Sequence, residues 1–125
     1  MKYIPSAQDI FANSEFDLDQ LIDRIDSLEI QLSNGNGRQI AVLFDSHMAH
    51  RTLNEGDALV TLDAIADSGR TGKYFYEVEN SEFIKWFQSE RYETSKGEEL
   101  KHYCIATVNF MVDVISIDPP TFVDR

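Results

Sequence analysis

The chain has 125 residues, a length typical of one domain, and its 42% hydrophobic and 11% aromatic content argues against a disordered protein. Eleven Lys and Arg face 22 Asp and Glu, and the formal net charge of −11 argues against direct binding of nucleic acid or of an anionic membrane. The single cysteine, Cys104, excludes an internal disulfide. Because MKYIPSAQDIF has no apolar leader and no run of about 18 apolar residues follows, we expect a cytoplasmic protein.

The first predicted element is a helix over residues 14–32. Ser14 is a suitable N-cap, and Asp17 follows three residues later, where a carboxylate favours the start of a helix. Apolar residues then recur at helical spacing and form one stripe: Leu18, Leu21, Ile22, Ile25, Leu28 and Leu32. The sequence NGNG, residues 34–37, ends the helix, because Gly and Asn accept the left-handed conformation of a C-cap.

The middle of the chain is expected to be less regular. RQIAVLFD, residues 38–45, is a short apolar run bounded by turn residues, which predicts a buried strand. Residues 46–57 are expected to form a loop. The segment after it, residues 58–66, fits either a helix or a strand, and we favour a strand at its start.

The second half alternates strand and helix patterns. KYFYEVEN, residues 73–80, predicts a strand, and the next residues predict a helix that is capped by Asn80 or Ser81. Two strands follow, at about 101–107 and 111–117, with a turn near Asn109, and Pro119-Pro120 ends the structure. These elements predict a single α+β domain over residues 1–125, with two main helices packed on a mostly antiparallel sheet.

The sequence FDSHMAHR, residues 44–51, raises the question of a metal site. His47 and His50 stand three residues apart, Asp45 lies close by, and His102 is the remaining histidine. A zinc ion takes about four N, S or O ligands, so these residues form a weak candidate set. The glutamate of an HExxH motif is missing, however. We therefore interpret the segment as a polar loop and keep a metal site as the alternative.

Other catalytic patterns are weak in this sequence. Cys104 and His102 share one strand face, but a small cysteine in the apolar run HYCIAT is more typical of a core. No P-loop, GxGxxG or GxSxG sequence is present. We therefore predict no catalytic residue and no cofactor.

Two groups of acidic residues are the best candidates for contact with a partner. Asp19, Asp23 and Asp26 would form one negative ridge on the first helix, opposite its apolar stripe. The second group mixes tyrosines and acids, which supply contact area and electrostatic steering for a basic partner. Its members are Tyr74, Tyr76, Glu77, Glu79, Glu82, Glu90, Tyr92 and Glu93.

Residues 74–120 resemble a known class of small bacterial proteins. The resemblance is carried by the aromatic helix FIKWF, the strand pair after HY, and the closing DPP. It is to the immunity proteins of contact-dependent inhibition and related polymorphic toxin systems. The resemblance implies an acidic, non-enzymatic, tight-binding protein, because many such proteins cover the basic active site of a nuclease. It assigns no contact residue, since the interfaces differ between pairs.

Four functions follow from these observations. The first is an immunity protein that neutralises a basic toxin, with a nuclease as the expected class. The second is a phage-type anti-CRISPR or DNA mimic that blocks a basic nucleic-acid channel by the same electrostatics. The third is a small metal-dependent enzyme that uses the His47 and His50 segment. The fourth is an interaction module that has no toxin partner.

Overall fold

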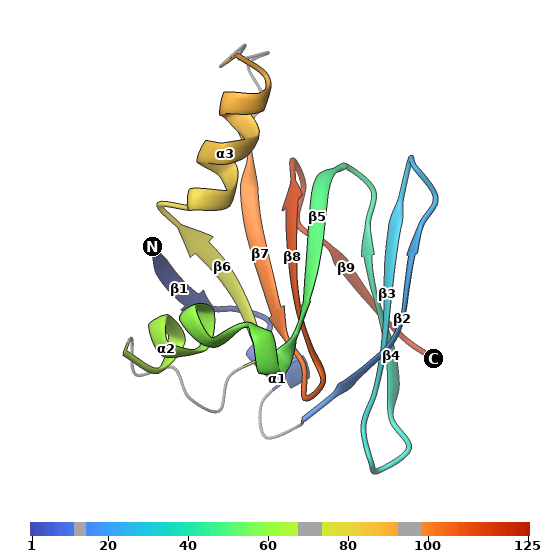
Figure 1. The fold of residues 1–125 in the computed structure, drawn as a ribbon. Helices are drawn as coiled ribbons and strands as arrows, with labels where there is room; N and C mark the ends of the chain where they lie inside the picture. The colour runs from blue at the N-terminus through green and yellow to red at the C-terminus, as the bar shows by residue number, and fades with distance from the viewer. Residues whose placement is uncertain (12–14, 68–73, 93–98) are drawn as a thin grey trace.

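The computed structural model describes residues 1–11, 15–67, 74–92 and 99–125. These residues form two antiparallel sheets that pack face to face (Figure 1). The five-stranded sheet has, in spatial order, β1 (Lys2–Pro5), β6 (Phe75–Glu79), β7 (Lys101–Ala106), β8 (Phe110–Ser116) and β5 (His47–Asn54). The four-stranded sheet has β2 (Asp17–Asp23), β3 (Leu28–Ser33), β4 (Gln39–Phe44) and β9 (Thr121–Asp124). The helical elements are α1 (Gln8–Phe11), the 3-10 turn η1 (Glu55–Asp57), α2 (Leu59–Asp67) and α3 (Glu82–Glu90).

The main core lies between the two sheets. Every second residue of the inner strands points into it, as the two-residue period of a strand requires. The four-stranded sheet contributes Leu28, Ile30, Leu32, Ile40, Val42 and Phe44. The five-stranded sheet contributes Phe75, Tyr103, Ile105, Val112 and Val114. The fold is therefore a mostly β sandwich, and the predicted α+β fold with two main helices on one sheet is wrong.

The largest error concerns residues 14–32, which were expected to be a helix. They contain the antiparallel pair β2 and β3, in which Asp23 pairs with Leu28 and Asp17 with Ser33. The apolar residues of this segment fit both periods, because Leu28, Ile30 and Leu32 also alternate as in a strand. Burial against the opposite sheet decides between the two patterns, since tertiary packing overrides a local preference.

Three other segments differ from expectation, and four agree. The expected loop at 46–57 contains β5, an edge strand whose mostly exposed residues give no apolar alternation. Residues 59–67 are helical rather than a strand, and β9 follows Pro119-Pro120. The expected strands β4 and β6, the β7–β8 pair and the helix α3 are confirmed. Ser81 is the N-cap of α3, and its hydroxyl accepts a hydrogen bond from the Ile84 amide at 3.0 Å.

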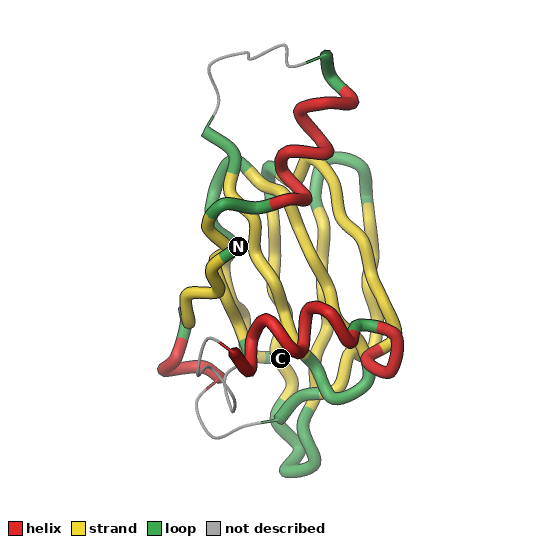
Figure 2. The backbone as a smooth tube through the Cα atoms, turned by 60° about the vertical axis from the view of Figure 1, so that its left-hand side comes forward, coloured by secondary structure: helices red, strands yellow, loops and turns green. Residues whose placement is uncertain are grey.

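The helices α2 and α3 cover the outer face of the five-stranded sheet, whereas Phe11 of α1 packs in the core between the sheets. Figure 2 shows α2 lying across the strands, with α3 at one end of the sheet. Beneath α2 lies a second apolar cluster that includes Ile65, Tyr76, Cys104 and Met111. None of the described helices is long and apolar enough to cross a membrane. No helix among the described residues lies on the outer face of the four-stranded sheet (Figure 1).

Candidate partner-binding surface

The turn between β2 and β3 forms an exposed tip, residues 23–27, which we call the hairpin tip. The Arg24 amide donates to the Ser27 carbonyl at 2.8 Å, and the Ile25 amide donates to Asp23 Oδ1 at 2.8 Å. Ile25 has a φ of 76° and is 91% exposed. A β-branched residue in the left-handed region is a conformational outlier, because its Cβ crowds the backbone there. The hairpin tip therefore presents a large apolar side chain to solvent in a strained conformation.

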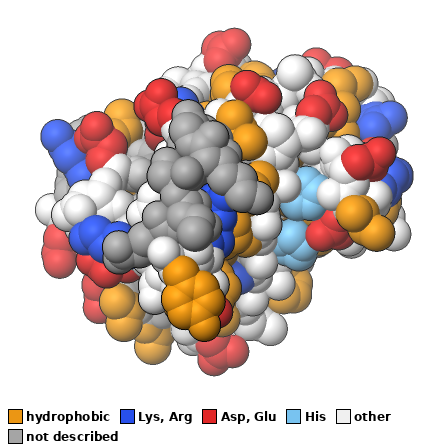
Figure 3. All heavy atoms as spheres, turned by 90° about the horizontal axis from the view of Figure 1, so that it is seen from above, with side chains coloured by type: hydrophobic (Ala, Val, Ile, Leu, Met, Phe, Trp, Pro, Cys, Tyr) orange, Lys and Arg blue, Asp and Glu red, His pale blue; other side chains and the backbone are white. Residues whose placement is uncertain are grey.

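Asp23 joins the two sheets through two histidines of β5. His47 Nε2 lies 3.0 Å from Asp23 Oδ1, and His50 Nε2 lies 3.0 Å from Asp23 Oδ2. His47 and His50 are three residues apart, and a β-bulge between His47 and Ala49 places them on the same side of the strand. We call these three side chains the His–Asp cluster. Seen from above, histidine side chains lie beside acidic and hydrophobic ones at this end of the molecule (Figure 3).

The electrostatics of the cluster favour an ionised carboxylate. The Ile25 amide, followed by the hydrogen bonds of His50 and His47, holds the pKa of Asp23 below its ordinary value of 3.8. Because a carboxylate only accepts hydrogen bonds, each histidine donates from its Nε2–H. The His47 side chain is only 6% exposed, and its Nδ1 atom has no hydrogen-bond partner among the described residues.

The structure separates the candidate metal ligands. Nε2 of His47 and of His50 each point at a carboxylate oxygen of Asp23. Asp45 is exposed in the turn after β4, and His102 is buried against Phe83 of α3, on the other face of its sheet. In the part of the chain that the structure describes, no three His, Cys, Asp or Glu side chains are placed to hold a metal ion.

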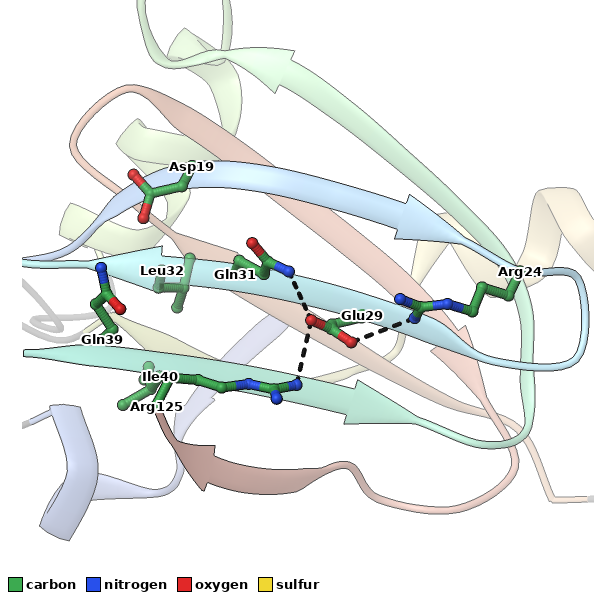
Figure 4. A pocket seen from close by; sticks show the side chains of 8 residues that line it. All are labelled: Asp19, Arg24, Glu29, Gln31, Leu32, Gln39, Ile40 and Arg125. Atoms are coloured by element: carbon green, nitrogen blue, oxygen red, sulfur yellow. Dashed lines mark hydrogen bonds and ion pairs between the residues drawn. The ribbon is translucent and has the colours of Figure 1, made fainter.

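A pocket of about 350 Å³ lies on the outer face of the four-stranded sheet, next to the hairpin tip (Figure 4). Its centre is the buried carboxylate of Glu29, which accepts from Gln31 at 2.7 Å and pairs with Arg24 at 3.2 Å and with Arg125 at 3.3 Å. The Gln31 amide is the main cause that holds the pKa of Glu29 below its ordinary value. The charge of Arg24 is therefore paired with that of Glu29. It does not neutralise the exposed acids of the hairpin.

The first predicted acidic group does not lie on a helix face. Asp19 lies at a β-bulge in β2, Asp23 ends that strand, and Asp26 lies in the hairpin tip. All three are exposed, as is Asp17. Within the described chain, Asp17, Asp19 and Asp26 form no ion pair. The three predicted residues therefore stay on one hairpin, although the helix expected to carry them is absent.

The second predicted group is dispersed. Tyr76 is fully buried, and Tyr74 is half-buried. Glu77 pairs with Lys101 at 3.4 Å and Glu82 pairs with Lys85 at 3.2 Å, so these two charges are partly neutralised. The remaining described members are exposed: Glu79, Glu90 and Tyr92. Glu93 lies outside the described residues.

A buried polar network under α3 has the residue types of a catalytic triad. His102 Nε2 donates to Asp113 Oδ1 at 2.6 Å, and Ser81 Oγ lies 2.7 Å from His102 Nδ1. In a Ser–His–Asp hydrolase the serine faces Nε2 and the aspartate faces Nδ1, so the ring is reversed here. All three side chains are buried, and the Ser81 hydroxyl also caps α3. The network therefore holds α3 on the sheet.

Cys104 is also part of the packing. Its thiol lies 3.3 Å from the sulfur of Met111, and the residue is fully buried. Burial is the main cause that raises the pKa of this thiol well above its ordinary value, so the thiolate needed for nucleophilic attack is disfavoured. The shared strand face of Cys104 and His102 is real, but His102 is bonded to Ser81 and Asp113 instead.

Sequence reasoning missed Ile25, because it was assigned to the buried stripe of a helix. It also missed the contact of Asp23 with the two histidines, which lie more than twenty residues further along the chain. Neither the exposure of Ile25 nor the contact of Asp23 with the histidines has a local sequence signal. No family model, curated protein or solved structure matches the chain.

Proposed function

We propose that the protein is a cytoplasmic inhibitor that binds a basic protein, with a toxin nuclease as the expected partner. The observation that carries this proposal is the net charge of −11, together with exposed acids on the β2–β3 hairpin that have no ion pair in the described chain. The resemblance of residues 74–120 to immunity proteins points to the same class.

The physics of such an inhibitor is electrostatic substitution. A nuclease binds phosphates with a basic cleft, and carboxylates on a rigid hairpin offer that cleft a similar distribution of negative charge. Opposite charges on the two partners raise the association rate and disfavour partners of the wrong sign. A DNA mimic would use the same surface, so the identity of the partner separates these two functions.

The candidate catalytic side chains are bonded to one another within the fold, and this supports a binding role. His102, Ser81 and Asp113 are engaged with one another below the surface. His47 and His50 are engaged with Asp23. The hairpin exposes carboxylates and Ile25 beside Gln20 and Arg24, and these carboxylates and this apolar side chain are suited to contact with another protein.

The direct test is capture of the partner from the source cell with the tagged full-length protein, followed by mass spectrometry. We expect a basic protein whose association slows as salt rises from about 0.05 to 0.5 M. Replacing Asp17, Asp19 and Asp26 with asparagine should slow association further. The matched control replaces the exposed Asp57, Asp63 and Asp67 at η1 and α2, which changes the net charge equally. An acidic partner, or equal effects of the two triple variants, would contradict the proposal.

A further inference from the structure

We propose that the hairpin tip is the anchor of the partner interface: Ile25 enters an apolar pocket on the basic protein, and Asp19 and Asp26 pair with cations around that pocket. This inference rests on the proposed function and specifies where the contact occurs and what the partner must offer.

The first support is that the fold makes no use of Ile25. Its side chain is 91% exposed, so it stabilises no core, and its φ of 76° disfavours a β-branched residue. Asparagine adopts this conformation more readily. The position therefore has an apolar side chain that the folded monomer neither buries nor accommodates without strain. A large apolar side chain at such a position is suited to burial against another protein.

The second support is that the hairpin tip is held in place from both sides. Asp23 accepts from the Ile25 amide and is itself bonded to His47 and His50 of the other sheet. On the opposite side, Arg24 is tied to the buried Glu29. An anchor that is already ordered loses little conformational entropy when it binds. The His–Asp cluster and the Glu29 pocket thereby acquire a common role, which is to fix the direction of Ile25.

The surroundings of Ile25 identify the chemistry of the partner surface. Asp19 and Asp26 are exposed on the same hairpin, and the whole chain carries a charge of −11, which favours a basic protein over an acidic one or an anionic membrane. Met48 and Ile117 are also exposed, 37% and 36% respectively, beside the turn that joins β4 to β5. This turn lies at the same end of the sandwich as the hairpin tip (Figure 1). The partner surface should therefore be an apolar pocket with a basic rim.

The test measures binding of the full-length protein to the purified partner by calorimetry. We expect Ile25→Asn to weaken binding by at least about 30-fold, the effect of a hot-spot residue. The melting temperature should be unchanged or higher, because asparagine relieves the strain. The matched control is Val60→Asn, which replaces an apolar residue that is 84% exposed on α2, and it should change the affinity less than about threefold.

The outcomes separate this inference from the proposed function. The wild-type protein could bind a basic partner while the affinity of Ile25→Asn stays within threefold of the wild-type value. In that case the anchor role of Ile25 is wrong, and the proposed inhibitor function stands. If no basic partner is captured, both fail. If light scattering shows that Ile25→Asn converts a wild-type dimer into a monomer, the occupant of the tip is a second copy of this chain, and the inference is overturned.

Discussion

Replacing His102 with alanine should lower the free energy of unfolding by about 3 to 5 kcal/mol, because the buried Asp113 loses a hydrogen-bond donor and the missing ring leaves a cavity. The His102 side chain is 1% exposed, it donates to Asp113 at 2.6 Å, and its ring packs edge-on against Phe83 with centroids 5.5 Å apart. Alanine removes all of these contacts and leaves a cavity. Among the described residues, Asp113, 3% exposed, would keep its ion pair with Arg51.

The loss is a large fraction of the 5 to 15 kcal/mol that is typical of a single domain. It should lower the melting temperature by roughly 10 to 20 °C for a chain of this size. Urea unfolding can be followed by circular dichroism and by the fluorescence of Trp86, the single tryptophan, which stacks on Phe83. A half-exposed tryptophan on α3 reports on the element that His102 supports.

The matched control is His50→Ala, which removes another histidine bonded to an aspartate. That pair is more exposed, with side-chain exposures of 26% and 39%, so its loss should lower the free energy of unfolding by about 1 kcal/mol or less. Equal effects of the two substitutions would refute the argument that burial sets the magnitude. A loss below about 1 kcal/mol for His102→Ala would refute the assignment of the network as a main stabilising contact.

Three further predictions concern pH and metals. Burial raises the pKa of Tyr3 and of Tyr103 to about 12, so stability should be full below pH 10 and decline as the pH rises toward 12, as measured by urea unfolding across that range. The pKa values of Asp23 and Glu29 lie below the ordinary 3.8 and 4.5, so the stability they contribute should be present above pH 4.5 and fall on further acidification. A free energy of unfolding that does not change below pH 4.5 would contradict this. Added zinc should leave the melting temperature within about 1 °C, and a rise that His47→Ala abolishes would restore the metal site.

The wrong helix prediction for residues 14–32 arose because one hydrophobic pattern fits two structures. Leu18, Leu21, Ile25, Leu28 and Leu32 satisfy a helical stripe, and a polar NGNG follows them. The same stretch satisfies a strand pair once Ile25 is moved out of the buried set and into a turn. Nothing within residues 14–32 selects one solution. The opposite sheet does, because it offers an apolar face that β3 can cover.

The candidate site depended on tertiary structure for a similar reason. His47 and His50 were recognised as a pair, but their partner is Asp23, which had been grouped with other acids on a helix. The bulge that turns both rings to one side of β5 is set by pairing with β8, more than sixty residues away. Asp113 is likewise buried by distant segments, because it accepts hydrogen bonds from His102 of β7 and from Arg51 of β5.

The sequence by itself determined the features that are local or summed over the chain. These are the charge of −11, the apolar strand β4, the start of α3 at a cap of Asn80 or Ser81, and the β7–β8 pair that turns near Asn109. Only the tertiary structure decided that two sheets form, that Asp23 meets the histidines, and that Ile25 is exposed. Caps, short turns and apolar runs act within a few residues, whereas strand pairing and burial depend on which distant segments supply the facing surface.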